Sequence, residues 1–485
     1  MKKIYLTLLV LFTVVFLNGC TKQLTEKPQN FLGPDNFYKS TADFDAAIAG
    51  TIRTYFTGYG TFDSYNAFFL CAGAEDVTGK GYNRFDALLP DPNSSNILVC
   101  WTGIYKAINQ ANMIIAKLPL ATAVPDASKL VYEGQARYLR ALGYFYLTRW
   151  FGKVPLILTP EDSNNALNVA ESPAIDIYTQ IIADLTFAKA NLSSSINKLR
   201  PTKGAASAML AEVYLNMTGW PLKDVSKYAL ARDEAKSVMD MGIYDLVVNF
   251  GDLWSFAGKL TNKEVMFMFN GITNAGSNFQ RSGRPSEEGG WEDFYTEKRY
   301  LDVFPDGPRK IATFHTTFNT TPPISYLTSG SKQPFMQKYY DSGAGGTPTA
   351  LLGGAGENFF PLNRYAEILL IYAEASNMAT PGGPSTDALE AINKVRRRAG
   401  GYNQAVYADL PAGMTQAAFD AAVINERFYE LGMECKRWFD LVRKEMVVQV
   451  NVGLYPYVDA HNLLIPKPQD QVNLSLGKLT QNPGY

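Results

Sequence analysis

Adjacent pairs of carboxylates are the side chains of this sequence that acid–base chemistry could use. Three such pairs that lie in predicted loops are at positions 75–76, 287–288 and 292–293. A glycosidase needs two carboxyl groups about 5–10 Å apart across a sugar-binding cleft. Spacing in sequence does not define that distance, and charges in solvated loops are the commoner origin of such pairs. The pairs therefore keep a surface glycosidase as an alternative without assigning any catalytic residue.

Motifs of other enzyme classes are absent or incomplete. The chain has no Gly-x-Ser-x-Gly, no His-Glu-x-x-His and no Cys-x-x-Cys. Its two histidines, His315 and His461, exclude a zinc centre of three histidines. Residues 73–81 resemble a phosphate loop, but Gly81 stands where a Ser or Thr must bind magnesium. The sequence thus predicts no catalytic residue, no cofactor and no metal site.

The first twenty residues have the pattern of a signal peptide that directs a protein to a membrane. Two lysines precede an apolar run over residues 4–17, which is shorter than the about 20 residues of a membrane-spanning helix. The run ends in LNGC at 17–20, which resembles the bacterial lipobox. That resemblance implies a signal peptide over 1–19 and a lipid on Cys20, whose thiolate is the nucleophile that lipidation requires. The polar residues 20–36 are then expected to be a tether.

Composition places the rest of the chain among globular proteins. The whole chain has 485 residues, 46% of them apolar and 19% charged. The 45 basic and 46 acidic side chains leave a net charge of −1, which argues against a nucleic-acid partner. Cys71, Cys100 and Cys435 are most simply buried apolar side chains. A Cys71–Cys100 bridge stays open, because spacing alone does not decide it.

Helical periodicity dominates the sequence. Phe44, Ile48 and Ile52, for example, recur at helical spacing and predict an amphipathic helix. The same pattern predicts helices over 41–56, 100–118, 130–151, 172–192, 203–218, 226–241, 363–378, 385–399 and 416–445. Between 245 and 360 the period weakens; residues 265–269 (VMFMF) predict a strand, and long Gly-, Ser-, Thr- and Pro-rich stretches predict functional loops.

A weak internal repeat connects some of these helices. LGYFY at 142–146, LAEVY at 210–214 and ILLIY at 368–372 match the centre of the tetratricopeptide pattern to decreasing degrees. Stacked helical hairpins bury a core that none of them buries alone. The fold class expected is therefore mainly α, with tetratricopeptide-like hairpins and a loop-rich irregular insertion.

The last predicted helix carries oppositely charged side chains three residues apart, on one helical face. We expect these pairs to be an ion-pair lattice that holds helices together, and the alternative is a polar site. The pairs are Arg427/Glu430, Glu434/Arg437 and Asp440/Arg443.

Two loop segments combine aromatic and planar polar side chains. Aromatic rings stack on the apolar faces of sugars, while amide, carboxylate and guanidinium groups bind the hydroxyls. Trp291 lies in a Gly-flanked polar segment at 289–295, where a large ring is hard to bury. A second such segment spans 81–86. The predicted ligand-binding residues are Trp291, Tyr295, Tyr82, Asn83, Arg84 and Asp86.

Several longer segments resemble the SusD/RagB family in consistent order along the chain. The strongest is Glu426-Arg427-x-x-Glu430-Leu431, which continues to an Arg-Trp-x-Asp-Leu-x-Arg run ending at Arg443. The other matching segments are 131–157, 201–214, 364–375, 391–396 and 481–485.

The resemblance implies a lipid-anchored protein of the Gram-negative outer membrane that faces the exterior. Such a protein binds a glycan without being an enzyme and pairs with a SusC-like TonB-dependent transporter. It also implies an N-terminal helical region over 37–244, a loop-rich ligand-binding insertion over 245–360 and a C-terminal helical region over 361–485. A scaffold that uses tetratricopeptide-like hairpins to bind only protein partners remains the second alternative, beside the glycosidase.

Overall fold

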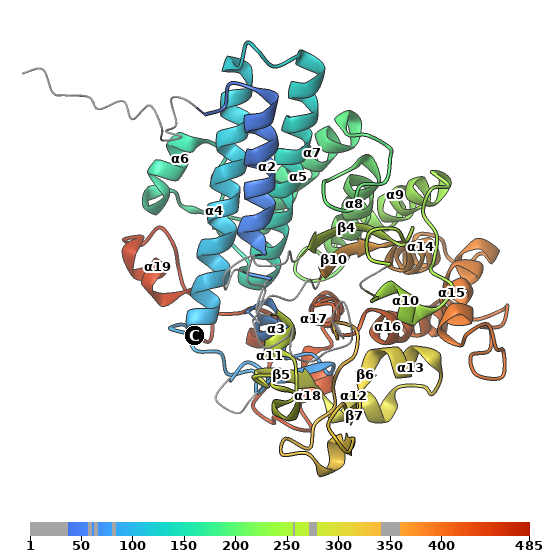
Figure 1. The fold of residues 1–485 in the computed structure, drawn as a ribbon. Helices are drawn as coiled ribbons and strands as arrows, with labels where there is room; N and C mark the ends of the chain where they lie inside the picture. The colour runs from blue at the N-terminus through green and yellow to red at the C-terminus, as the bar shows by residue number, and fades with distance from the viewer. Residues whose placement is uncertain are drawn as a thin grey trace, which may run out of the picture.

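The computed structural model describes residues 37–56, 61–62, 66–79, 84–255, 258–270, 279–340 and 359–485. Nine long helices form a curved row within these ranges, and consecutive helices pack side by side (Figure 1). Nearly all of them lie where the apolar periodicity predicts. They are α2 (Thr41–Tyr55), α4 (Ser95–Lys117), α5 (Asp126–Phe151), α7 (Ala174–Asn191), α8 (Lys203–Met217), α9 (Lys227–Asp240), α14 (Tyr365–Ala379), α15 (Thr386–Ala399) and α16 (Gln416–Leu431).

The row of helices is built by local signals and close packing. Ser40 caps α2 through a reciprocal hydrogen-bond pair with Asp43. Gly143 of α5 lies so close to α2 that an added Cβ would be 2.6 Å from the Tyr55 hydroxyl. The Tyr55 hydroxyl in turn donates to the Leu139 carbonyl at 2.9 Å. The glycine of the first tetratricopeptide-like match therefore allows neighbouring helices to touch, and the prediction of a mainly α fold is confirmed.

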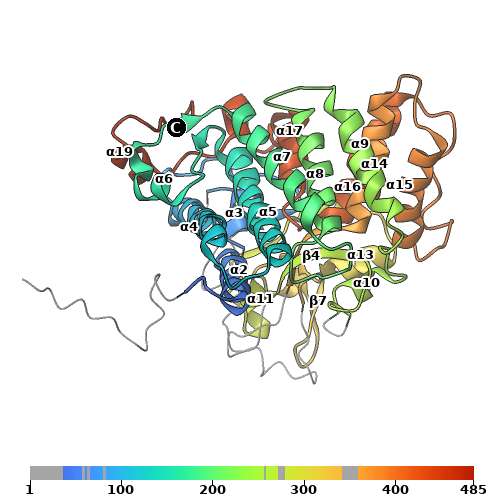
Figure 2. The same ribbon diagram turned by 90° about the horizontal axis from the view of Figure 1, so that it is seen from above.

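Short helices and strands of the region 245–360, among them α10, α11, α13, β4 and β7, lie together along one side of this row (Figure 2). The short helices are α3 (Asn66–Leu70), α6 (Pro160–Asn164), α10 (Phe250–Leu253), α11 (Phe279–Ser282), α12 (Lys298–Val303), α13 (Pro308–Thr313), α17 (Arg437–Arg443), α18 (Val447–Asn451) and α19 (Gln469–Leu474). Among the other short helices, α6 and α19 lie at the α4 end of the row (Figure 1). No helix in the described ranges combines the length and apolarity that crossing a membrane requires.

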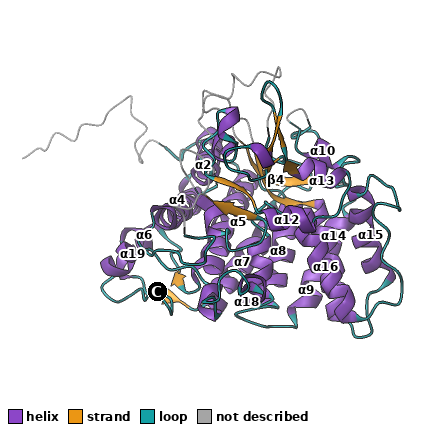
Figure 3. Ribbon diagram, turned by 90° about the horizontal axis from the view of Figure 1, so that it is seen from below, coloured by secondary structure: helices purple, strands orange, loops and turns teal. Residues whose placement is uncertain are grey.

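The strands of the described residues form five separate antiparallel pairs, which Figure 3 shows in orange. The longest joins β4 to β10, and β4 covers the predicted strand at 265–269. Phe269 of β4 and Phe360 of β10 each pack against Phe62, with ring centroids 5.3 and 5.4 Å apart, so this pair is anchored to the core. The strands are β1 (Val77–Gly79), β2 (Val154–Pro155), β3 (Glu171–Ser172), β4 (Val265–Asn270), β5 (Phe294–Thr296), β6 (Phe314–His315), β7 (Thr317–Phe318), β8 (Ile324–Ser325), β9 (Phe335–Met336) and β10 (Phe359–Arg364).

The predicted helix over 416–445 is wrong in one respect, because it is interrupted between α16 and α17. A Cβ on Gly432 would lie 1.9 Å from the Tyr300 hydroxyl, so Tyr300 occupies the space into which α16 would continue. Lys338 Nζ donates to two main-chain carbonyls at this end of α16, at 2.8 and 3.0 Å. Both side chains come from the loop-rich region and satisfy the helix end in place of a further turn.

The predicted charge pairs are only partly correct. Asp440 and Arg443 do pair, at 2.9 Å. Arg427 binds Asp440 at 2.8 Å rather than Glu430, and Arg437 binds Glu75 instead of Glu434. The interruption of the helix separates Glu434 from Arg437, whereas Arg427 and Glu430 both lie in α16 and bind charged groups of other elements instead.

Glu430 shows what these charges do. Its buried carboxylate lies 2.8 Å from Arg309 and 2.6 Å from Arg364, and it also binds Arg398. Burial by itself would raise the pKa of Glu430, but the three guanidinium groups outweigh it and hold the pKa well below the usual range. The expectation of an ion-pair lattice that joins helices is consistent with this arrangement. Cys71, Cys100 and Cys435 are buried and free, so the bridge that spacing left open is not formed.

Candidate functional site

The β1–β5 strand pair brings the two predicted ligand-binding segments together. Thr78 of β1 lies opposite Tyr295 of β5, and Gly79 lies opposite Phe294. The Tyr295 hydroxyl donates to the Gly79 carbonyl at 3.1 Å, which fixes the ring across the strand pair. Segments more than 200 residues apart in sequence thus form one surface. We call it the β1–β5 face and define it by Arg84, Asp86, Tyr295, Glu297, Tyr455 and Tyr457.

Asp86 is held on this face by two hydrogen bonds. Its carboxylate accepts from the Thr78 hydroxyl at 3.0 Å and from the Ala87 main-chain N–H at 2.9 Å. Burial raises the pKa of Asp86, and these two hydrogen bonds oppose the rise. Arg84, two residues before, is exposed.

Two tyrosines from the C-terminal region complete the face, although they were not predicted. The Tyr457 hydroxyl donates to the Ala87 carbonyl at 2.7 Å, while 46% of the residue remains exposed. Tyr455 lies beside it, with ring centroids 6.0 Å apart and planes inclined by 37°. Both rings are within electrostatic reach of Asp86. They follow Gly453 in a Gly-Leu-Tyr-Pro-Tyr segment, a Gly-flanked aromatic pattern like the one that singled out Trp291.

Glu297 was also missed, and it has the most perturbed pKa of the face. Burial raises the pKa of Glu297 to about 7; Arg299 opposes the rise, and the nearby Asp86 carboxylate adds to it. The Arg299 Nε atom is 3.7 Å from the Glu297 carboxylate, too far for a hydrogen bond. Glu297 is therefore a half-buried carboxyl group without a close cation.

The acidic pair at 75–76 lies behind this face and has structural partners. Arg437 donates two hydrogen bonds to the Glu75 carboxylate, of 2.8 and 2.9 Å. Asp76 is buried and accepts the Met433 main-chain N–H at 2.6 Å. Burial raises the pKa of Asp76 to about 6, although the Met433 N–H works in the opposite direction. These carboxylates connect β1 to the residues between α16 and α17.

Trp291 is half-buried in the irregular segment just before β5. Its main-chain N–H donates to the Arg281 carbonyl at 2.7 Å, and the Arg281 guanidinium lies 4.6 Å from the centroid of its ring. The indole is thus packed within its own loop, and its contact with a ligand stays a prediction. Tyr82, Asn83 and Cys20 lie outside the described residues.

The β1–β5 face can stack and hydrogen-bond at the same time. Tyrosine rings present apolar faces, while Arg84 supplies donors and Asp86 and Glu297 supply acceptors in planar geometry. Within the described ranges, no group of three or more His, Cys, Asp or Glu side chains is arranged to hold a metal ion. The arrangement suits a ligand with both apolar faces and hydroxyl edges.

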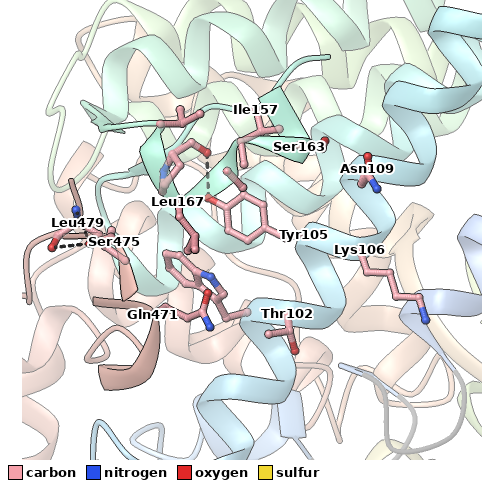
Figure 4. Close-up of a pocket in the computed structure, with 14 residues that line it drawn as sticks. Thr102, Tyr105, Lys106, Asn109, Ile157, Ser163, Leu167, Gln471, Ser475 and Leu479 are labelled. Carbon is pink, nitrogen blue, oxygen red and sulfur yellow. Dashed lines mark hydrogen bonds between the residues drawn. The ribbon is translucent and has the colours of Figure 1, made fainter. Parts of the chain in front are cut away.

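A separate hollow of about 380 Å³ lies between α4 and α19 (Figure 4). Trp101, Ile157 and Leu167 give it a largely apolar lining. Tyr105, which points into it, already donates its hydroxyl to the Pro155 carbonyl at 2.8 Å. This hollow contains none of the predicted ligand-binding residues.

Comparison with known proteins identifies the class to which this fold belongs. The family model described as "SusD family" matches residues 267–485, and the one described as "Starch-binding associating with outer membrane" matches residues 57–215. The chain therefore belongs to the SusD/RagB family.

Individual relatives agree over the whole length. SusD-like protein P2 of Formosa agariphila is 28% identical, with full coverage of both chains. The crystal structure of a SusD homolog from Bacteroides thetaiotaomicron superposes with a TM-score of 0.82 at 23% identity, covering 93% of this chain and 98% of that one. A laminarin-binding SusD-like protein superposes with a TM-score of 0.74 at 23% identity, covering 92% and 99%. The resemblance noted in the sequence is confirmed.

Proposed function

We propose that this protein captures a glycan on the β1–β5 face and delivers it to a SusC-like TonB-dependent transporter in the outer membrane. The observation that carries the proposal is the convergence of Tyr295, Tyr455 and Tyr457 with Arg84 and Asp86 on one face. A solved relative of the same fold is described as laminarin-binding, which agrees in ligand class.

Retention in native gels that contain polysaccharide tests this proposal. Wild-type protein is expected to be retarded by at least one of starch, laminarin, xylan and mannan. Tyr457→Ala should reduce the affinity roughly thirtyfold, because truncating a central aromatic costs about 2 kcal/mol or more. Tyr457→Phe should retain most of the affinity, since the ring remains and only the bond to the Ala87 carbonyl is lost.

Tyr402 offers a matched control. It is also an exposed tyrosine, at 55%, and it follows α15 away from the β1–β5 face. Tyr402→Ala should be retarded like wild type. Equal retardation of Tyr457→Ala and Tyr402→Ala would contradict the assignment, and free migration of the wild type in every gel would favour the protein scaffold.

Bond cleavage would overturn the non-enzymatic part of the proposal. Asp86 and Glu297 are the carboxylates that a glycosidase would use here, because they flank the tyrosines and both have raised pKa values. We expect purified protein to release no reducing ends from any retarding polysaccharide. Release that Glu297→Gln abolishes would establish the glycosidase instead.

Membrane attachment through Cys20 is the remaining part of the proposal. Its support is the lipobox-like LNGC and the family description that mentions the outer membrane. Growth with a fatty-acid analogue should label the wild type but not Cys20→Ala, which should leave the membrane fraction while remaining folded. Equal labelling of the two proteins would disprove the anchor.

A further inference from the structure

A larger hollow, of about 770 Å³, is lined by residues of α10, α13 and the strands β6 and β7. These elements lie to the right of β5 in Figure 1. Its volume lies within the about 300–1,000 Å³ typical of small-molecule sites. None of its lining residues belongs to the β1–β5 face. The residues that matter for its chemistry are Trp254, Ile311, His315, Asn319, Gln337 and Tyr340.

One wall of this hollow is polar and is held in place from behind by Glu288. The buried Glu288 carboxylate lies 2.8 Å from His315 Nε2 and accepts the Asn319 main-chain N–H at 2.6 Å. The Asn319 side-chain amide donates to the Tyr340 hydroxyl, also at 2.6 Å. The His315 and Tyr340 rings lie 4.4 Å apart. Three hydrogen-bonding side chains are thus pre-positioned, which lowers the entropy that a ligand must overcome.

The charge of Glu288 is balanced within the protein. Arg284 Nη2 lies 3.7 Å from its carboxylate, and the Arg284 guanidinium also stacks over the Tyr340 ring at 4.1 Å. Arg284 and Glu288 are both buried and neither lines the hollow. They position the polar wall and leave no net charge facing a ligand.

The remaining lining is apolar or neutral. Trp254, Pro308 and Ala312 line the hollow, and Ile311 stands at its edge with 76% of its surface exposed. Gln337 adds a planar amide, which offers both a donor and an acceptor. Among the lining residues that the structure describes there is no Lys, Arg, Asp or Glu.

We propose that this hollow is a second carbohydrate-binding site, which takes one or a few units of an uncharged sugar. A charged ligand would find no counter-ion, and burying an unpaired charge is costly. A wholly apolar ligand would take water away from the Asn319 side-chain carbonyl and the Gln337 amide without replacing its hydrogen bonds. A neutral sugar has apolar faces for Trp254 and Ile311 and hydroxyls for Asn319, Gln337 and Tyr340.

This second site extends the capture proposed for the β1–β5 face but does not depend on it. Two sites on one chain that engage the same polymer raise its retention, because the second contact is intramolecular. The sugar at the second site therefore adds avidity rather than a new reaction.

Saturation-transfer NMR with small sugars tests the second site directly. The panel is glucose, galactose, mannose, xylose, maltose, cellobiose and laminaribiose, with glucuronate and galacturonate as charged counterparts. The protein is the Tyr457→Ala variant, so that binding at the β1–β5 face is already weakened. We expect at least one neutral sugar to bind and both uronates to fail.

Two substitutions then locate the binding. Asn319→Ala and Gln337→Leu, each added to Tyr457→Ala, should lower the affinity for that neutral sugar at least tenfold. Both residues are partly or fully exposed, and the melting temperature checks that each variant folds. Asn164→Ala, an exposed asparagine at the end of α6, is the matched control and should bind like its parent.

The outcomes separate the two proposals. Binding of no neutral sugar, binding unchanged by both Asn319→Ala and Gln337→Leu, or equal binding of a uronate would each overturn the second site. Loss of polysaccharide retention in Tyr457→Ala with intact small-sugar binding would support both sites. Unchanged retention in Tyr457→Ala would count against the β1–β5 face only.

Discussion

The C-terminal helices and the β1–β5 face differ in how closely cations surround their carboxylates, and so in the pKa values of those carboxylates. Glu430 of α16 is buried and meets three guanidinium groups, which come from α13, β10 and α15, two of them at 2.6 and 2.8 Å. Glu297 on the β1–β5 face has its nearest cation, Arg299, at 3.7 Å. The pKa of Glu430 is consequently held well below the usual range, whereas burial raises that of Glu297 to about 7.

This difference separates a region whose charges stabilise the fold from a region whose polar groups can bind a ligand. A buried and fully paired charge contributes to stability only as long as every partner is present. A half-buried carboxyl group with no close cation is a poor stabiliser but is available to an incoming hydroxyl. The same residue type therefore holds helices together in one region and lies open to a ligand in the other.

The largest effect is expected from Glu430→Ala. Removing this carboxylate leaves three buried guanidinium groups without their shared partner, so the free energy of unfolding should fall by about 3–5 kcal/mol. Denaturant unfolding measures the loss, and Glu390→Ala, at a half-exposed pair with Arg397, should cost about 0–1 kcal/mol. If Glu430→Ala unfolded like wild type yet lost glycan retention, this region would belong to the binding site.

Arg437→Ala should have an intermediate effect on stability. Its partner Glu75 is 13% exposed, so water can partly replace the lost bonds. We expect a fall of about 2–3 kcal/mol, between the values for exposed and buried pairs. Polysaccharide retention, measured well below the melting temperature, should stay unchanged, and a selective loss of retention would contradict a structural role.

Trp291→Ala tests whether the indole contacts the ligand or only stabilises its own loop. The ligand-contact prediction gives roughly thirtyfold weaker retention, about 2 kcal/mol, with a nearly unchanged melting temperature. Loss of the Arg281 contact with the ring should by itself lower stability by only about 0.5–1 kcal/mol, which agrees with a small change in melting temperature. Unchanged affinity with a large drop in melting temperature would show that Trp291 is a structural plug.

The smallest effect concerns the pH dependence of stability. In the folded protein Glu297 keeps its proton up to about pH 7, whereas in the unfolded chain it loses it near pH 4.3, so the folded state binds the extra proton between these values. Stability should therefore fall as pH rises through this window. Glu297→Gln cannot ionise and should be more stable than wild type at pH 8, with no difference at pH 4. A constant difference at both pH values would contradict the raised pKa.

The helices were predictable because their signals are local. Phe44, Ile48 and Tyr55 recur on one face of α2, and Ser40 marks its start. The end of α16 was not predictable, because the Tyr300 and Lys338 side chains that occupy it come from over 90 residues away. Tertiary contacts override helical periodicity at that point.

The candidate site was half predictable for the same reason. Tyr295, Arg84 and Asp86 stand out by residue type in their own loops, and the structure brings them together. Tyr457 joins them through a hydrogen bond to Ala87 across 370 positions of sequence. No local pattern reveals that contact, although the Gly-flanked aromatic segment around Tyr457 could have nominated it.

Hydroxyl-radical footprinting with and without a retarding polysaccharide tests the central claim most directly. Oxidation of exposed tyrosines reports which of them the bound glycan covers. Capture on the β1–β5 face predicts that Tyr455 and Tyr457 become protected while Tyr402, which is 55% exposed elsewhere, reacts as before. Unchanged oxidation of Tyr455 and Tyr457 at saturating polysaccharide would contradict glycan capture on this face.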